Sequence, residues 1–191
     1  MRWWLNARAI KLLLLVSILT VLLLVLPVSA LTATPSPGGA TLALAAMAAL
    51  ALPASIGWAL SRGDEGLERR AIRPTAAADL GLVLALVVGV VTLEGVLCAA
   101  GLAAAGLVAA RAALTYTGMM LISASFGGWG SAAIVPAIYF TFVLVVGGGS
   151  DVDNPAAWAW IGAPGTNAAA MAAAAGTFLI GVIARARWAL R

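Results

Sequence analysis

Histidine is absent from this sequence, cysteine occurs once, and charged side chains make up only 9% of the residues. Without histidine, the chain lacks the most common general base and metal ligand. The lone cysteine, Cys98, allows no internal disulfide and no cysteine-based metal site. Soluble domains carry about 25% charged residues, so a chain with so few lacks the polar surface that a water-soluble globule needs. With 63% hydrophobic residues, we expect an integral membrane protein.

The motifs of common enzymes are also missing. No glycine-rich loop is followed by Lys and Ser or Thr, no segment carries a pair of zinc-binding histidines, and no serine lies in a nucleophile elbow. The glycine-rich stretches at 127–130 and 147–149 have the glycines without that chemistry. We therefore predict a non-catalytic chain that binds no metal and no cofactor directly.

Long apolar runs take the place of these motifs. About 20 residues of α-helix cross the roughly 30 Å hydrocarbon core, and a helix satisfies its own backbone there. Charged or Pro- and Gly-rich stretches divide the sequence into six such runs. We predict an all-α polytopic membrane protein whose residues 1–191 form a single transmembrane domain. The six predicted spans are approximately 12–31, 40–60, 80–100, 102–126, 132–148 and 165–184.

Three local features bear on where these spans begin, bend and end. The first run follows basic residues and contains Val28-Ser29-Ala30, a small-residue pattern that resembles a signal-peptide cleavage site. Because the run is long enough to span, we expect it to be retained. Pro53 should kink the second span. A break near Gly101 is required, because one helix over 80–110 would be about 46 Å long.

Positive charges gather at alternate ends of the predicted spans. Three precede the first span, four lie in the segment 61–79 and three close the chain, so ten of the eleven Lys and Arg residues follow one pattern. The positive-inside rule then places both termini and this segment in the cytoplasm, with the protein in the inner (plasma) membrane. Because the cations are dispersed at membrane boundaries, we do not expect nucleic acid as a partner.

The segment 61–79 holds eight of the chain's eighteen formal charges. Its central part can form two to three helical turns, with Glu65 and Arg69 spaced for an intrahelical ion pair, before Pro74 ends the helix. Two interpretations stay open: a solvated connector whose charges set the topology, and a cytoplasmic loop on which a soluble partner docks. The candidate docking residues are Asp64, Glu65, Leu67, Glu68, Arg69, Arg70 and Arg73.

Glu94 and Arg111 are the two charges inside predicted spans. Each costs at least about 2.5 kcal/mol there unless it is paired or faces water. If the third and fourth spans turn near Gly101, both residues lie at a similar depth on adjacent antiparallel helices. We predict an intramembrane ion pair that ties these helices together. The alternative is that both residues line a substrate path.

Small residues recur at four-residue spacing in the sixth span, at Ala168, Ala172 and Gly176. Such spacing predicts a face on which another helix packs closely, although it is also common in any alanine-rich helix.

The polar segment 149–164 combines acidic and aromatic residues, namely Asp151, Asp153, Trp158 and Trp160. Tryptophan favours the membrane interface, so we predict that this segment folds back and lies at the outer surface. The two aspartates are too few for a calcium site.

Taken together, six spans, cytoplasmic termini, a charged loop between spans two and three and a short return between spans five and six resemble the membrane subunit of a type-2 ABC exporter. The middle of the chain is also similar to the RxxLxxxG…G…P pattern of compact actinobacterial permeases of this class. The matching positions are Arg111, Leu114, Gly118, Leu121, Gly127, Pro136 and Tyr139.

This resemblance implies a function and partners. The chain would be a permease subunit that forms a transmembrane path for a lipophilic or amphipathic substrate. The loop 61–79 would dock on a separate ATP-binding subunit that holds ATP and Mg, and a second copy or a homologue would complete the dimer in the lipid bilayer. The alternatives are a solute-binding membrane subunit of an energy-coupling importer and a helical membrane scaffold without a transport role.

Overall fold

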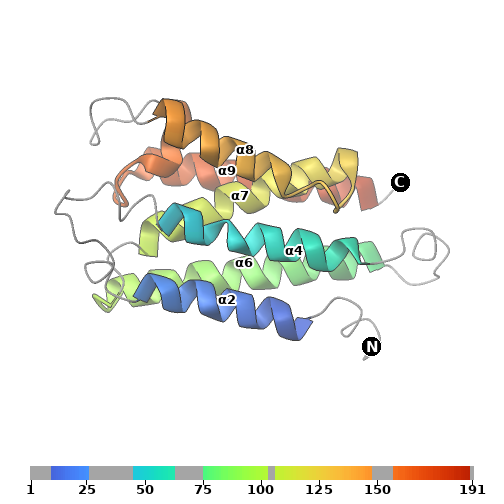
Figure 1. The fold of residues 1–191 in the computed structure, drawn as a ribbon, viewed down its shortest axis with the longest axis horizontal. Coiled ribbons are helices and arrows are strands. Elements are labelled where there is room, and N and C mark those ends of the chain that lie inside the picture. The colour runs from blue at the N-terminus through green and yellow to red at the C-terminus, as the bar shows by residue number, and fades with distance from the viewer. Residues whose placement is uncertain (1–9, 26–44, 63–74, 103–105, 148–156, 190–191) are drawn as a thin grey trace.

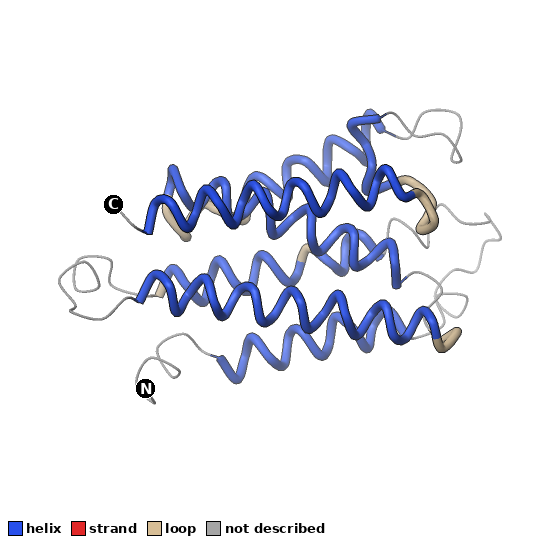
Figure 2. The backbone as a smooth tube through the Cα atoms, turned by 180° about the vertical axis from the view of Figure 1, so that it is seen from behind, coloured by secondary structure: helices blue, strands red, loops and turns tan. Residues whose placement is uncertain are grey.

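The computed structural model describes residues 10–25, 45–62, 75–102, 106–147 and 157–189. Regular structure in these ranges is helical, and no strand occurs among them, so the all-α prediction is confirmed. The helices lie side by side along one long axis (Figures 1 and 2). In chain order they are α2 (Ile10–Val25), α4 (Ala51–Ser61), α6 (Thr75–Ala99), α7 (Gly106–Gly127), α8 (Ile134–Phe142), the π-helix η2 (Val143–Gly147), the 3₁₀-helix η3 (Ala157–Gly162) and α9 (Ala168–Ala189).

Three of the described helices are long and apolar enough to cross a membrane: α6, α7 and α9. The other described apolar helices are shorter, and α2 has 16 residues. At 1.5 Å per residue, a 16-residue helix covers about 24 Å, less than the roughly 30 Å hydrocarbon core. The structure therefore contains helices that are long and apolar enough to span a membrane, and the number of six spans stays a prediction.

Two helices reach further along the chain than the predicted spans. α6 begins at Thr75, so the last five residues of the segment 61–79 are helical, and Asp79 is buried. α9 continues to Ala189 and includes Arg185 and Arg187. Alanine-rich sequence is the best helix former, and a single charge does not end a helix. The spans predicted from hydropathy are therefore shorter than the helices at these two places.

The predicted break near Gly101 is confirmed. α6 ends at Ala99, and Gly101 has φ +73°, a left-handed conformation that glycine adopts without steric cost. The Gly101 N–H donates to the Cys98 carbonyl at 3.0 Å, and the Leu102 N–H donates to the Leu97 carbonyl at 2.9 Å. These two bonds form a Schellman motif, which satisfies carbonyls that the helix end would leave free.

Pro53 lies in a helical stretch from Ala45 to Ser61 that is interrupted by a turn at Leu50. Proline has no N–H to donate to the carbonyl four residues earlier, which removes one helical bond in this region. Pro53 is the third residue of α4, where a missing donor costs little. The turn at Leu50 lies three residues before the proline and keeps right-handed helical φ and ψ angles, so the kink at Pro53 stays a prediction.

α7 is the central helix of the bundle, with buried residues along most of its length. Its closest neighbour is α9. A Cβ atom added to Gly181 would lie 2.5 Å from the Gly118 carbonyl oxygen, and one added to Gly118 would lie 2.6 Å from the Thr177 carbonyl oxygen. The two backbones therefore approach so closely that only glycine fits at either position.

The predicted packing face of α9 is not the face that meets α7. Ala168 and Ala172 are exposed, and a Cβ on Gly176 would meet no atom within 4 Å. The buried face lies elsewhere on α9 and is formed by Ala170, Ala174, Phe178, Gly181 and Arg185. Because α9 is rich in small residues on all sides, four-residue spacing alone does not indicate which side meets α7.

Candidate functional site

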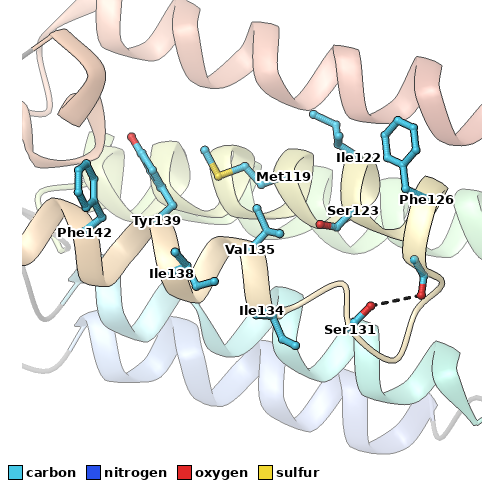
Figure 3. Close-up of a pocket in the computed structure, with 11 residues that line it drawn as sticks. Met119, Ile122, Ser123, Phe126, Ser131, Ile134, Val135, Ile138, Tyr139 and Phe142 are labelled. Carbon is cyan, nitrogen blue, oxygen red and sulfur yellow. Dashed lines mark hydrogen bonds between the residues drawn. The ribbon is translucent and has the colours of Figure 1, made fainter.

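An open apolar groove of about 820 Å³ lies between α7 and α8 (Figure 3). Each helix contributes apolar side chains three or four residues apart, the spacing that places side chains on one face of a helix. The large apolar side chains that line it are Met119, Ile122 and Phe126 from α7 and Ile134, Val135, Ile138 and Phe142 from α8. Its volume is within the roughly 300–1,000 Å³ of small-molecule sites.

The groove has few polar groups, and two of these are already engaged. The Ser131 hydroxyl donates to the Gly127 carbonyl at 3.2 Å, and the Tyr139 hydroxyl donates to the Trp158 carbonyl at 2.8 Å. No charged side chain lines it. The groove can therefore bind an apolar molecule, and it offers no acid, base or activated nucleophile.

The turn that joins α7 to α8 closes one end of this groove. Within it, Gly128 has φ +75° and Trp129 is buried. Trp129 belongs to the same apolar cluster as Leu52 and Ile56 of α4. A Cβ on Gly57 of α4 would lie 3.5 Å from the Trp129 carbonyl oxygen. We call residues 128–133 the Trp129 turn, and α4 is in van der Waals contact with it.

α9 holds the Trp129 turn from another side. The Arg185 guanidinium carbon lies 4.4 Å from the centre of the Trp129 ring and 4.2 Å from that of Trp188. One of its nitrogens donates to the Ala124 carbonyl at 3.1 Å. A cation over an indole face is attracted by the ring quadrupole. Arg185 thus links the last turns of α7 and α9 to the turn at the end of the groove.

Arg111 holds the segment around η3 against α7. Its Nη1 donates to the Pro164 carbonyl at 2.9 Å, and its Nη2 donates to the carbonyls of Ile161, at 3.1 Å, and of Ala163. Carbonyl oxygens at the C-terminal end of a helix carry partial negative charge, which favours a cation. Arg111 therefore obtains its stabilisation from backbone carbonyls.

The predicted ion pair between Glu94 and Arg111 does not form. Both side chains are fully buried, but the Glu94 carboxyl oxygens have no hydrogen-bond partner. The carboxyl lies against Gly106, where an added Cβ would be 3.2 Å from Glu94 Oε2. Arg111 is five residues further along α7, about 140° around the helix axis. The prediction of similar depth ignored this rotation and the accompanying rise of about 7.5 Å along the helix axis.

The two described tryptophans of the predicted outer segment pack against the bundle. Trp158 lies 5.0 Å from Phe142 and Trp160 lies 5.8 Å from Tyr139, measured between ring centres. The Trp160 indole N–H donates to the Thr115 hydroxyl at 3.1 Å. Side chains of α7 and α8 therefore hold η3 in place. Asp151 and Asp153 lie outside the described residues.

The candidate docking residues between 64 and 73 also lie outside the described part of the chain. Sequence reasoning missed the groove and the Trp129 turn. The apolar spacing of Met119, Ile122 and Phe126 was visible, but the same spacing is typical of a lipid-facing stripe. A tryptophan between the glycines of 127–130 was the one clue to a packed turn.

Among residues 10–25, 45–62, 75–102, 106–147 and 157–189, no three Cys, Asp or Glu side chains gather in a way that could hold a metal ion. In the comparisons with known proteins, no family model, no curated protein and no solved structure matches this chain.

Proposed function

We propose that this chain is the permease subunit of an ATP-driven exporter in the plasma membrane, with six spans and both termini in the cytoplasm. The observation that carries the proposal is the contact between α4 and the Trp129 turn. α4 ends where the charged segment begins, and the turn joins the two helices that line the apolar groove. A partner that moves the charged segment would thereby act on the groove.

The placement of the helix ends supports this coupling between the charged segment and the groove. The end of α4, the start of α6 and the turn between α7 and α8 lie at the same end of the bundle (Figure 1). Four of the five described cations, Lys11, Arg62, Arg185 and Arg187, belong to helix ends on this side, and Arg111 is the exception. With the positive-inside rule, this end is the cytoplasmic one. An ATP-binding subunit that binds the segment between α4 and α6 would therefore lie at the end of the bundle that contains the Trp129 turn.

The chemistry of the groove supports a lipophilic cargo. Its walls are apolar, and the described residues that form it leave it open towards the outside of α7 and α8. In a bilayer, an apolar molecule can enter such a groove without losing hydration. Binding of ATP on the partner would shift α4 and the Trp129 turn between two arrangements, as in other two-state transitions. The second membrane subunit would supply the facing half of the path.

The first test is purification of the protein with a C-terminal tag, in mild detergent and from its native host, followed by mass spectrometry. We expect a stoichiometric ATP-binding subunit. In a variant with Glu65, Glu68, Arg69 and Arg70 all changed to alanine, this subunit should be lost or its ATP hydrolysis uncoupled from substrate. The matched control, with Asp151 and Asp153 changed to alanine, should keep both.

Absence of any ATP-binding subunit from the wild-type preparation would contradict the proposal. A tightly held small molecule without an ATPase would then favour a solute-binding subunit of an importer. A stable complex with other membrane proteins would favour a scaffold.

A further inference from the structure

Glu94 is a buried acid that the proposed transport mechanism leaves unused. Its side chain is fully buried in α6, and neither carboxyl oxygen has a hydrogen-bond partner. α7 closes over it at Gly106, where an added Cβ would lie 2.8 Å from the Glu94 carbonyl oxygen and 3.3 Å from the Cβ of Cys98. The carboxyl group is thus enclosed at a tight contact between two apolar helices.

No described cation compensates a negative charge at this place. Arg111 donates to the carbonyls near η3, as described above. The basic residues of α2 and α9 lie in the first turn of α2 and the last turns of α9, at the opposite end of the bundle. The described titratable and charged side chains on α6 and on the helices packed against it are Lys11 on α2, Asp79, Glu94 and Cys98 on α6, Arg111 and Tyr116 on α7, and Arg185 and Arg187 on α9.

An ionised carboxylate here would be a buried charge without a donor or a counter-cation, which is far more costly than a buried neutral acid. The first turn of α7 would favour an anion through its dipole, but it donates no hydrogen bond to either oxygen. We propose that Glu94 is a proton-binding site: its carboxyl group holds one proton in the folded protein, and release of that proton loosens the contact between α6 and α7 at Gly106.

The position of Glu94 gives this proton a short path to the end of the bundle. Glu94 is five residues before the end of α6 at Ala99, which corresponds to about 7 Å along the helix axis. Beyond this end, Gly101 and Leu102 are exposed. A proton therefore has to pass little more than one helical turn, at the end of the bundle opposite the Trp129 turn (Figure 1). The site does not depend on the proposed transport function.

The first test compares the melting temperatures of the wild type and Glu94→Gln in detergent at about pH 6 and about pH 9. Glutamine has the shape of the neutral acid and does not ionise. We expect similar melting temperatures at the lower pH and a lower melting temperature for the wild type at the higher pH. An equal difference at both pH values, or a less stable Glu94→Gln at both, would overturn the proposal.

The second test needs only the wild-type protein and therefore does not depend on how the variant folds. The apolar reagent dicyclohexylcarbodiimide adds the O–H of a protonated carboxyl across one C=N bond, and the product rearranges to an N-acylurea that keeps the whole reagent. We expect this adduct on the peptide that contains Glu94. Its yield should fall about tenfold for each pH unit once most of the sites are ionised.

Glu94→Gln is the matched control for the adduct, which should be absent from that variant. A wild-type protein that carries no adduct on Glu94 at about pH 6, where an ordinary glutamate is already ionised, would overturn the proposal. Modification of the same peptide in both proteins would also overturn it, because the reagent would then have reacted elsewhere.

Discussion

Replacement of Gly181 by alanine tests the close packing of α7 on α9. The added Cβ would lie 2.5 Å from the Gly118 carbonyl oxygen, 3.0 Å from its Cα and 3.1 Å from its carbonyl carbon. All three atoms belong to the backbone, so no side chain can rotate away to make room. The two helices would have to separate along the contact that joins the centre of the bundle to its last helix.

The size of the effect follows from two opposing terms. Overpacking of a closely packed contact costs about 1–3 kcal/mol, whereas alanine in place of glycine favours a helix by up to about 1 kcal/mol. We expect a net loss of about 1–2 kcal/mol in the free energy of unfolding. For a chain of this length, that loss lowers the melting temperature by roughly 2–8 °C.

Gly176→Ala is the matched control, because Gly176 lies on the same helix and an added Cβ there meets no atom within 4 Å. This variant should melt at or above the temperature of the wild type. The assay is thermal unfolding of the three purified proteins in the same detergent. If Gly181→Ala were as stable as Gly176→Ala, the reasoning from close backbone approach would be refuted.

Two further predictions concern the contacts around the groove. Arg111→Met leaves the carbonyls near η3 without their donor. Since each buried unsatisfied group costs about 1–3 kcal/mol, we expect the free energy of unfolding, measured by heat or denaturant, to fall by at least about 2 kcal/mol. Arg111→Lys, which lacks the fork of two Nη groups, should be intermediate in stability, and an Arg111→Met variant as stable as the wild type would contradict the role of Arg111 as this donor. Gly57→Ala should be tolerated because the nearest atom is 3.5 Å away, whereas Gly57→Leu should push α4 off the Trp129 turn and reduce substrate-stimulated ATP hydrolysis while the subunits still assemble. Unchanged stimulation in Gly57→Leu would exclude coupling through this contact.

The sequence by itself determined the features that depend on local chemistry. Composition and the length of the apolar runs predicted an all-helical protein with helices long and apolar enough to span a membrane, because hydropathy and backbone satisfaction are properties of each segment alone. The break at Gly101 was predictable for the same reason, since a helix over 80–110 would be too long and glycine permits the left-handed turn that the structure contains.

Only the tertiary structure decided which side of each helix meets which neighbour. Arg111 finds its acceptors about 50 residues further along the chain, and Glu94 finds none, although the sequence predicted the two at a similar depth. α9 buries the face of Gly181 and leaves open space where a side chain on Gly176 would lie. Helices that are apolar or alanine-rich on all sides carry no pattern that distinguishes one face from another. Their rotation about the helix axis is therefore set by packing, and with it the groove between α7 and α8.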